Sequence, residues 1–102
     1  MMASGWIGIL SAELHFPAAH SLKEKRMSVR SAKEQLRNRF GAAVAEGDHH
    51  DVWQRTRLTV AVVTRSAGEA ERLLADAERY LASREWELGP VERRLVTPDD
   101  DD

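Results

Sequence analysis

HSLKEKRMSVRSAKEQLRNRF, residues 20–40, decides the fold, because this stretch predicts one long helix with a single buried face. Ser21 followed by Glu24 is a capping box, in which the serine hydroxyl accepts from the Glu24 amide and the glutamate carboxylate reaches back to the cap amide. Gly41 can adopt the left-handed conformation that ends a helix. Apolar side chains at helical spacing predict the face that packs on the core, made of Leu22, Val29, Ala32, Leu36 and Phe40.

A second set of side chains on the same helix is basic and follows the same spacing on the adjacent arc. A row of long cations on a rigid helix matches the charge of a polyanion without reading its bases. The alternative is a solvated face whose aliphatic stems cover the edge of the core. We predict that RNA phosphates bind this basic stripe, which consists of Lys23, Arg26, Arg30, Lys33 and Arg37.

The rest of the chain predicts four strands and a second helix. Apolar patterning indicates strands at residues 6–16, 42–46, 53–64 and 86–96, and a Ser66–Glu69 cap indicates a helix at 67–84. The order strand, helix, strand, strand, helix, strand is the ferredoxin-like plan. We therefore predict an α+β fold, with strands 6–16 and 53–64 central in a four-stranded antiparallel sheet and both helices on one face. Gly89 and Pro90 predict an edge position or a bulge in the last strand.

Length and composition predict one domain. The 102 residues suffice for a single core, which we place at 1–97, followed by an acidic and disordered tail at 98–102. The chain has no cysteine, which excludes a disulfide, a thiolate zinc site and a cysteine nucleophile. No stretch approaches the ~20 apolar residues of a membrane helix. The sequence therefore predicts a cytoplasmic protein that does not associate with membranes.

One end of the predicted sheet gathers polar residues that are far apart in the chain. The directions of the strands bring the start of the first helix, the turn at 48–51 and the neighbouring strand ends to a common rim. The turn reads DHHD, and its imidazoles and carboxylates are ligand types of hydrolytic metal centres, so a metal-dependent hydrolase is one hypothesis. One short turn does not complete a ligand set, and we predict no metal, no cofactor, no catalytic residue and no enzymatic activity. The rim candidate site comprises His20, His49, His50, Trp53 and Arg55.

The sheet face that the helices leave uncovered predicts a homodimer. Pairing of the two central strands gathers apolar side chains at one end of this face and charged side chains at the other. A monomer seldom leaves such an apolar patch bare. The predicted oligomer interface is Ile7, Ile9, Ala61 and Val63.

Three segments of the chain resemble the YlxP family, a small bacterial family defined as a domain of unknown function. The segments are HFPAAHSLKEKR at 15–26, RNRF at 37–40, and DHHDVWQR at 48–55 followed by LTVAVV. The similarity extends from Gly8 to about Leu95 and implies a ferredoxin-like fold without an established catalytic activity. Genes of the family are found beside those of the transcription factor NusA, translation initiation factor two and a ribosome-binding factor. The resemblance therefore implies a link to RNA or the ribosome.

Two functional hypotheses stand beside the hydrolase. The first is a non-enzymatic RNA- or ribosome-associated binding protein that contacts the polyanion through the basic stripe. The second is a homo-oligomeric protein–protein interaction module that uses the uncovered sheet face. Salt distinguishes them, because polyanion binding weakens steeply with ionic strength and an apolar interface does not.

Overall fold

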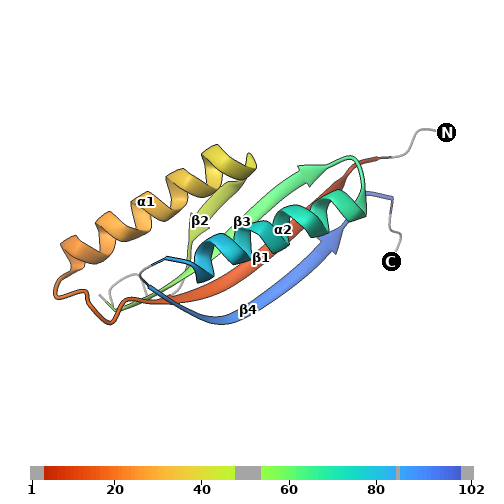
Figure 1. Cartoon of the computed structure of the whole chain (residues 1–102). Coiled ribbons are helices and arrows are strands. Elements are labelled where there is room, and N and C mark those ends of the chain that lie inside the picture. The colour runs from red at the N-terminus through yellow and green to blue at the C-terminus, as the bar shows by residue number, and fades with distance from the viewer. Residues whose placement is uncertain (1–3, 48–53, 85, 100–102) are drawn as a thin grey trace.

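The predicted ferredoxin-like order is the order of the elements in the structure. The computed structural model describes residues 4–47, 54–84 and 86–99. The sheet is antiparallel with strand order β2-β3-β1-β4, and Figure 1 shows both helices on one of its faces. The prediction of an α+β fold with the first and third strands at the centre is confirmed. The elements are β1 (Trp6–His15), α1 (Leu22–Phe40), β2 (Ala43–Glu46), β3 (Arg55–Thr64), α2 (Ala67–Ala82) and β4 (Glu87–Val96).

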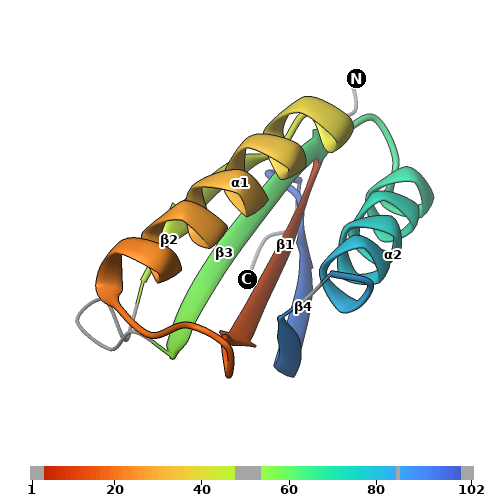
Figure 2. The ribbon, with the colours of Figure 1, turned by 60° about the vertical axis from the view of Figure 1, so that its left-hand side comes forward.

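The two central strands have one buried and one open face. β1 pairs with β3 along its whole length, from Trp6 opposite Thr64 to His15 opposite Arg55. Every second side chain of each strand points toward the helices, as the period of a strand requires. Figure 2 shows the helices on this side, with α1 along β2 and β3 and α2 along β1 and β4. The buried side chains of the two strands include Leu10, Ala12, Leu14, Leu58, Val60 and Val62.

Helix α1 begins and ends where the sequence predicts. The Glu24 amide donates to Ser21 Oγ at 3.2 Å, and Gly41 has φ 62° while its N–H donates to the Arg37 carbonyl at 3.0 Å. The Glu24 carboxylate accepts from the His20 N–H, which corrects the prediction that it reaches the cap amide. Of the predicted core face, Val29, Ala32 and Leu36 are buried, and Leu22 and Phe40 at the two ends are half-buried.

Helix α2 packs tightly on β1 at a glycine. Ser66 caps the helix by accepting from the Glu69 amide at 3.1 Å, and the helix ends at Ala82, two residues before the predicted end. A Cβ on Gly8 would lie 3.1 Å from side-chain atoms of both Leu74 and Val62. A side chain at this position would therefore require Leu74 and Val62 to shift by a few tenths of an ångström.

β4 is an edge strand with an irregularity near its start. Its register against β1 shifts between Ala12 and Leu14, so that Gly89 and Pro90 together lie opposite Glu13. Two residues opposite one is the arrangement of a β-bulge. Both parts of the prediction for this strand, the edge and the bulge, are confirmed.

A row of aromatic rings joins the ends of the two helices. Trp86 contacts Phe16 and Tyr80 edge-on, with ring centroids 5.9 and 6.4 Å apart, and Tyr80 contacts Phe40 at 6.3 Å. The Trp86 indole N–H donates to the Leu81 carbonyl at 2.9 Å. This row closes the core between the helices at the end of the sheet where β4 begins.

Candidate nucleic-acid interface

The basic stripe lies on the arc of α1 that faces the β2 edge of the sheet. Four of its cations are exposed and Lys33 is half-buried. Within the described parts of the chain, none of the five is within ion-pair distance of a carboxylate. Arg37 donates to the Val44 carbonyl at 3.3 Å, which holds its guanidinium near β2. Arg26, Arg30 and Lys33 line an open depression of about 160 Å³.

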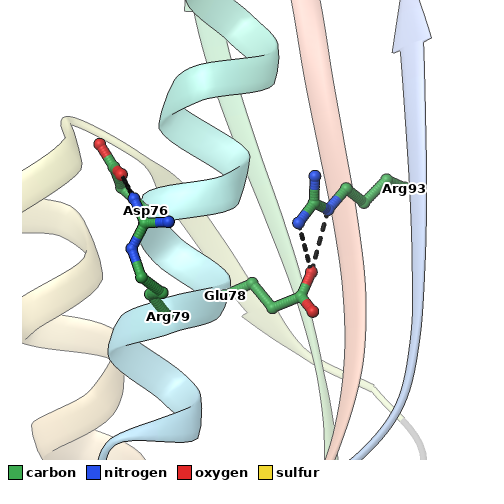
Figure 3. A network of polar contacts seen from close by, with 4 residues as sticks. All are labelled: Asp76, Glu78, Arg79 and Arg93. Atoms are coloured by element: carbon green, nitrogen blue, oxygen red, sulfur yellow. Dashed lines mark hydrogen bonds and ion pairs between the residues drawn. The ribbon is translucent and has the colours of Figure 1, made fainter.

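Two cations on the α2 side of the molecule are paired with carboxylates. Figure 3 shows Arg79 of α2 paired with Asp76 one turn before it, and Arg93 of β4 bound to Glu78 through two nitrogens at 3.0 and 2.6 Å. These carboxylates reduce the positive charge that the two arginines present to a ligand. The five cations of the basic stripe have no such partner among the described residues, and they follow one another along a single helix, which makes the stripe the main candidate site.

A buried lysine below the stripe is the feature that the sequence analysis missed. Lys25 is 1% exposed, and its Nζ lies 3.3 Å from Oε2 of Glu46 on β2. The same oxygen accepts from the Thr56 hydroxyl at 2.6 Å. The sequence contains a signal for this, because Lys25 falls on the apolar arc between Leu22 and Val29, but lysine is seldom fully buried unless it is paired. The pair compensates the charge of Glu46, which lines the same depression as the stripe.

Only part of the rim candidate site falls within the described residues. His49, His50 and Trp53 lie outside them, together with the rest of the 48–51 turn. His20 is exposed on the connection before α1, and Arg55 is exposed at the start of β3. Arg55 lies opposite His15, whose Nδ1 is 3.1 Å from Oε1 of Glu87. The described part of the rim therefore places Arg55 on the open face of the sheet.

The prediction that the rim holds no metal depends in part on residues outside the described ranges. Across residues 4–47, 54–84 and 86–99, no three histidine, aspartate or glutamate side chains are grouped so that they could hold a metal ion. The two histidines of the 48–51 turn are not among these residues. The absence of a metal stays a prediction.

The open sheet face has the register that the sequence predicts. Ile7 lies opposite Val63, and Ile9 lies opposite Ala61. Val63 is 77% exposed and is one of the two large apolar side chains most open to solvent in the described chain. At the other end Arg57 lies opposite Glu13, and its guanidinium donates to Ser11 Oγ at 2.7 Å. The predicted arrangement of the face is confirmed, while its use as an interface stays a prediction.

Residues 7–93 of the chain match the family described as "Protein of unknown function (DUF503)". The chain belongs to the DUF503 family. A DUF503 relative, the "Uncharacterized protein YlxP" of Bacillus subtilis (strain 168), is 32% identical over 90 residues, which cover 78% of this chain and 98% of the relative. The predicted resemblance is confirmed. Neither description names an activity.

Two solved structures are similar to the DUF503 chain at low sequence identity. The putative antibiotic biosynthesis monooxygenase from Bacillus cereus aligns with a TM-score of 0.46 and 13% identity over 97% of each chain. The de novo designed protein Ferredog-Diesel aligns with a TM-score of 0.40 and 16% identity, over 90% of this chain and 89% of the design. At such identities these likenesses transfer no function. Separately, no helix among the described residues is both long and apolar enough to cross a membrane.

Another cavity of the DUF503 chain lies between the C-terminal turns of its helices. It has a volume of about 530 Å³, and Arg39 and Tyr80 line it. The guanidinium of Arg39 lies 5.3 Å from the Tyr80 ring centre and that of Arg84 lies 5.6 Å away. The cations at this position offset the negative ends of the two helix dipoles. We therefore assign the cluster a structural role.

Raising the pH above about 10 is expected to destabilise the fold through Tyr80. Burial raises the pKa of the Tyr80 phenol above its ordinary value of 10.0, while Arg84 and Arg39 oppose part of the shift. The unfolded chain therefore loses this proton at a lower pH than the folded chain, and the free energy of unfolding falls as pH rises through this interval. Urea unfolding between about pH 9 and 12 measures the decline. Tyr80→Phe, the control, should decline less steeply; equal slopes would contradict the prediction.

Proposed function

We propose that this DUF503 protein binds the phosphate backbone of single-stranded RNA, free or in the ribosome, through the basic stripe. The observation that supports this is the lack of a carboxylate partner for any of the five cations among the described residues. Lys23 and Arg37, the outer members of the stripe, are 14 positions apart in α1. At 1.5 Å per residue the stripe is roughly 21 Å long, with one cation per turn or nearly so.

The chemistry of the stripe favours backbone contact over the reading of bases. The guanidinium groups of Arg26, Arg30 and Arg37 can each hold a phosphate through two N–H donors, while the two lysines act as point charges. Proteins that stack RNA bases on a sheet of this type use aromatic side chains on the central strands. β3, which reads RTRLTVAVVT, has none. We therefore expect affinity with little sequence preference.

The double substitution Arg30→Glu with Lys33→Glu tests this function. Counterion release gives a log–log salt slope of about −0.7 for each phosphate contact on single strands, so five contacts set a ceiling of about −3.5. Losing two contacts should flatten the slope by about 1.4 and weaken binding at low salt roughly tenfold or more. Fluorescence anisotropy with a labelled single-stranded RNA, titrated at several salt concentrations, measures both quantities.

A matched control separates the stripe from net charge. Arg65→Glu with Arg72→Glu changes the total charge by the same amount as the stripe variant. Arg65 lies just before α2 and Arg72 lies within it, and both side chains are exposed. The control should bind RNA nearly as well as the wild type, and all three proteins should melt alike in circular dichroism because no substituted side chain belongs to the core. If the stripe variant binds RNA as well as the wild type, the stripe is an ordinary solvated surface that does not contact RNA. An equal loss in both variants would show that only total charge matters.

A further inference from the structure

The open sheet face carries an apolar patch that crosses the sheet. In one row of neighbours, Ile7 of β1 lies between Val96 of β4 and Val63 of β3. In the next row, Ile9 lies beside Ala61, which pairs in turn with Ala43 of β2. Both helices are on the other side of the sheet (Figure 2) and give these side chains no cover. The patch is therefore an apolar surface without a partner inside the described chain.

The charged side chains on the same face balance one another. Among the described residues, three arginines and three glutamates project from it. Arg57 lies between Ser11, to which it donates, and the Glu92 carboxylate at 3.9 Å. A face with equal numbers of both charges does not attract a polyanion, whereas it can complement a copy of itself. The six residues are Arg55, Arg57, Arg94, Glu13, Glu87 and Glu92.

We infer that two copies of this chain pack their open sheet faces together around a two-fold axis that runs parallel to the strands, along the seam between β1 and β3. This axis places β1 of one copy over β3 of the other. Each β1 residue therefore lies over the partner's copy of the β3 residue with which it pairs in its own sheet. Ile7 then lies over the partner's Val63, and Ile9 over the small side chain of the partner's Ala61. Glu13 lies over the partner's Arg57, and the partner's Glu13 over Arg57.

The axis follows from the distribution of apolar and charged side chains along the strands. A two-fold axis across the strands, through the row of Ser11 and Thr59, would set Ile7 over the partner's His15 and leave charged groups covered by apolar ones. Burying charges without partners costs free energy. The axis along the seam lowers this cost in the central strands, because it places Ile7 and Ile9 over apolar side chains and Glu13 over the partner's Arg57.

The area that this axis covers suits a weak dimer. The axis sets β4 over the partner's β2, which has only four residues, while β1 and β3 have ten each. At ~3.3 Å per residue and ~4.8 Å between strands, the covered part of each face measures roughly 440 Å². Two such faces bury roughly 900 Å², below the ~1,000 Å² of a stable specific interface and in the range of transient ones. We therefore expect a dimer whose population depends on protein concentration.

Light scattering over a series of protein concentrations tests the dimer. The wild type should approach twice the monomer mass, and Ile9→Glu and Val63→Glu should each raise the dissociation constant by more than about 100-fold, because each charge is buried twice in a symmetric dimer. Met27→Glu is the matched control, since Met27 is a 62% exposed apolar residue on α1, away from the face. A wild type that stays monomeric, or associates only when RNA is added, would overturn the inference. So would equal dissociation by the control.

A mixing experiment tests the axis. Glu13→Arg and Arg57→Glu should each dissociate the dimer, because each sets like charges across the interface. An equimolar mixture of the two variants should recover dimers, since every arginine then lies over a glutamate. Circular dichroism melting confirms that both variants are folded before mixing, and native mass spectrometry identifies the mixed dimer. If each variant alone is monomeric and their mixture also stays monomeric, the axis along the seam is contradicted. If either variant alone dimerises as well as the wild type, the interface itself is contradicted. Neither experiment depends on RNA binding by the stripe.

Discussion

Replacing Lys25 with methionine is expected to lower the free energy of unfolding by about 3–5 kcal/mol. The lysine ammonium lies beside Glu46, and both side chains are largely buried between α1 and the β2 edge, at 1% and 15% exposure. Without Lys25 the largely buried glutamate keeps the hydrogen bond from the Thr56 hydroxyl but loses its ammonium partner, so the cost of its desolvation is compensated less. Urea unfolding followed by circular dichroism at pH 7 measures the loss.

Removing both charges together should restore most of that loss. In Lys25→Met with Glu46→Gln, the substituted amide oxygen still accepts from the Thr56 hydroxyl, a bond of 2.6 Å in the native protein. Replacement of a buried ion pair by neutral groups of similar volume is often close to neutral, so we expect the double variant within about 1–2 kcal/mol of the wild type. A single Lys25→Met variant as stable as the wild type would show that the ammonium is solvated, contrary to the structure.

Truncation of Trp86 to alanine is expected to cost about 3–5 kcal/mol as well. The indole is 5% exposed, contacts Phe16 and Tyr80 edge-on, and donates to the Leu81 carbonyl. Its loss opens a cavity in the aromatic row and leaves a carbonyl at the end of α2 without its donor. In a domain of 102 residues the melting temperature should fall by more than about 10 °C.

Trp86→Phe separates the cavity from the hydrogen bond. Phenylalanine keeps a ring between Phe16 and Tyr80 but has no N–H, so we expect a loss of about 1–2 kcal/mol. Thermal unfolding by circular dichroism compares the two variants directly. Similar losses in both would assign the effect to the hydrogen bond, and no loss in either would contradict the buried position of the indole.

The sequence predicted those features that depend on local patterns and on general rules of chain connection. Ser21 and Gly41 mark the ends of α1 because capping is decided by neighbouring residues. The position of β1 and β3 at the sheet centre follows from the handedness of crossovers and from their apolar runs. The exposure of the basic stripe follows from helical periodicity, since its members are off the apolar arc.

Features that depend on how two elements dock could not be read from spacing alone. Lys25 is on the buried arc, but its burial depends on Glu46 of β2, which lies beside it only after α1 docks on the sheet. The contact between Phe40 and Tyr80 requires the C-terminal turns of both helices to meet, which depends on how far α1 and α2 are shifted along the sheet.

The irregular β4 edge determines how assemblies of this protein can grow. A long regular edge strand is a template on which a strand of another chain adds, and repeated addition produces fibrils. Gly89 and Pro90 interrupt the register of β4 near its start, and proline has no N–H to donate to an incoming strand. Exposed Glu92 and Arg94 add charge to the rest of that strand. Edge-to-edge addition of strands is therefore disfavoured on the β4 side, and concentrated solutions should contain closed particles of a few chains and no filaments.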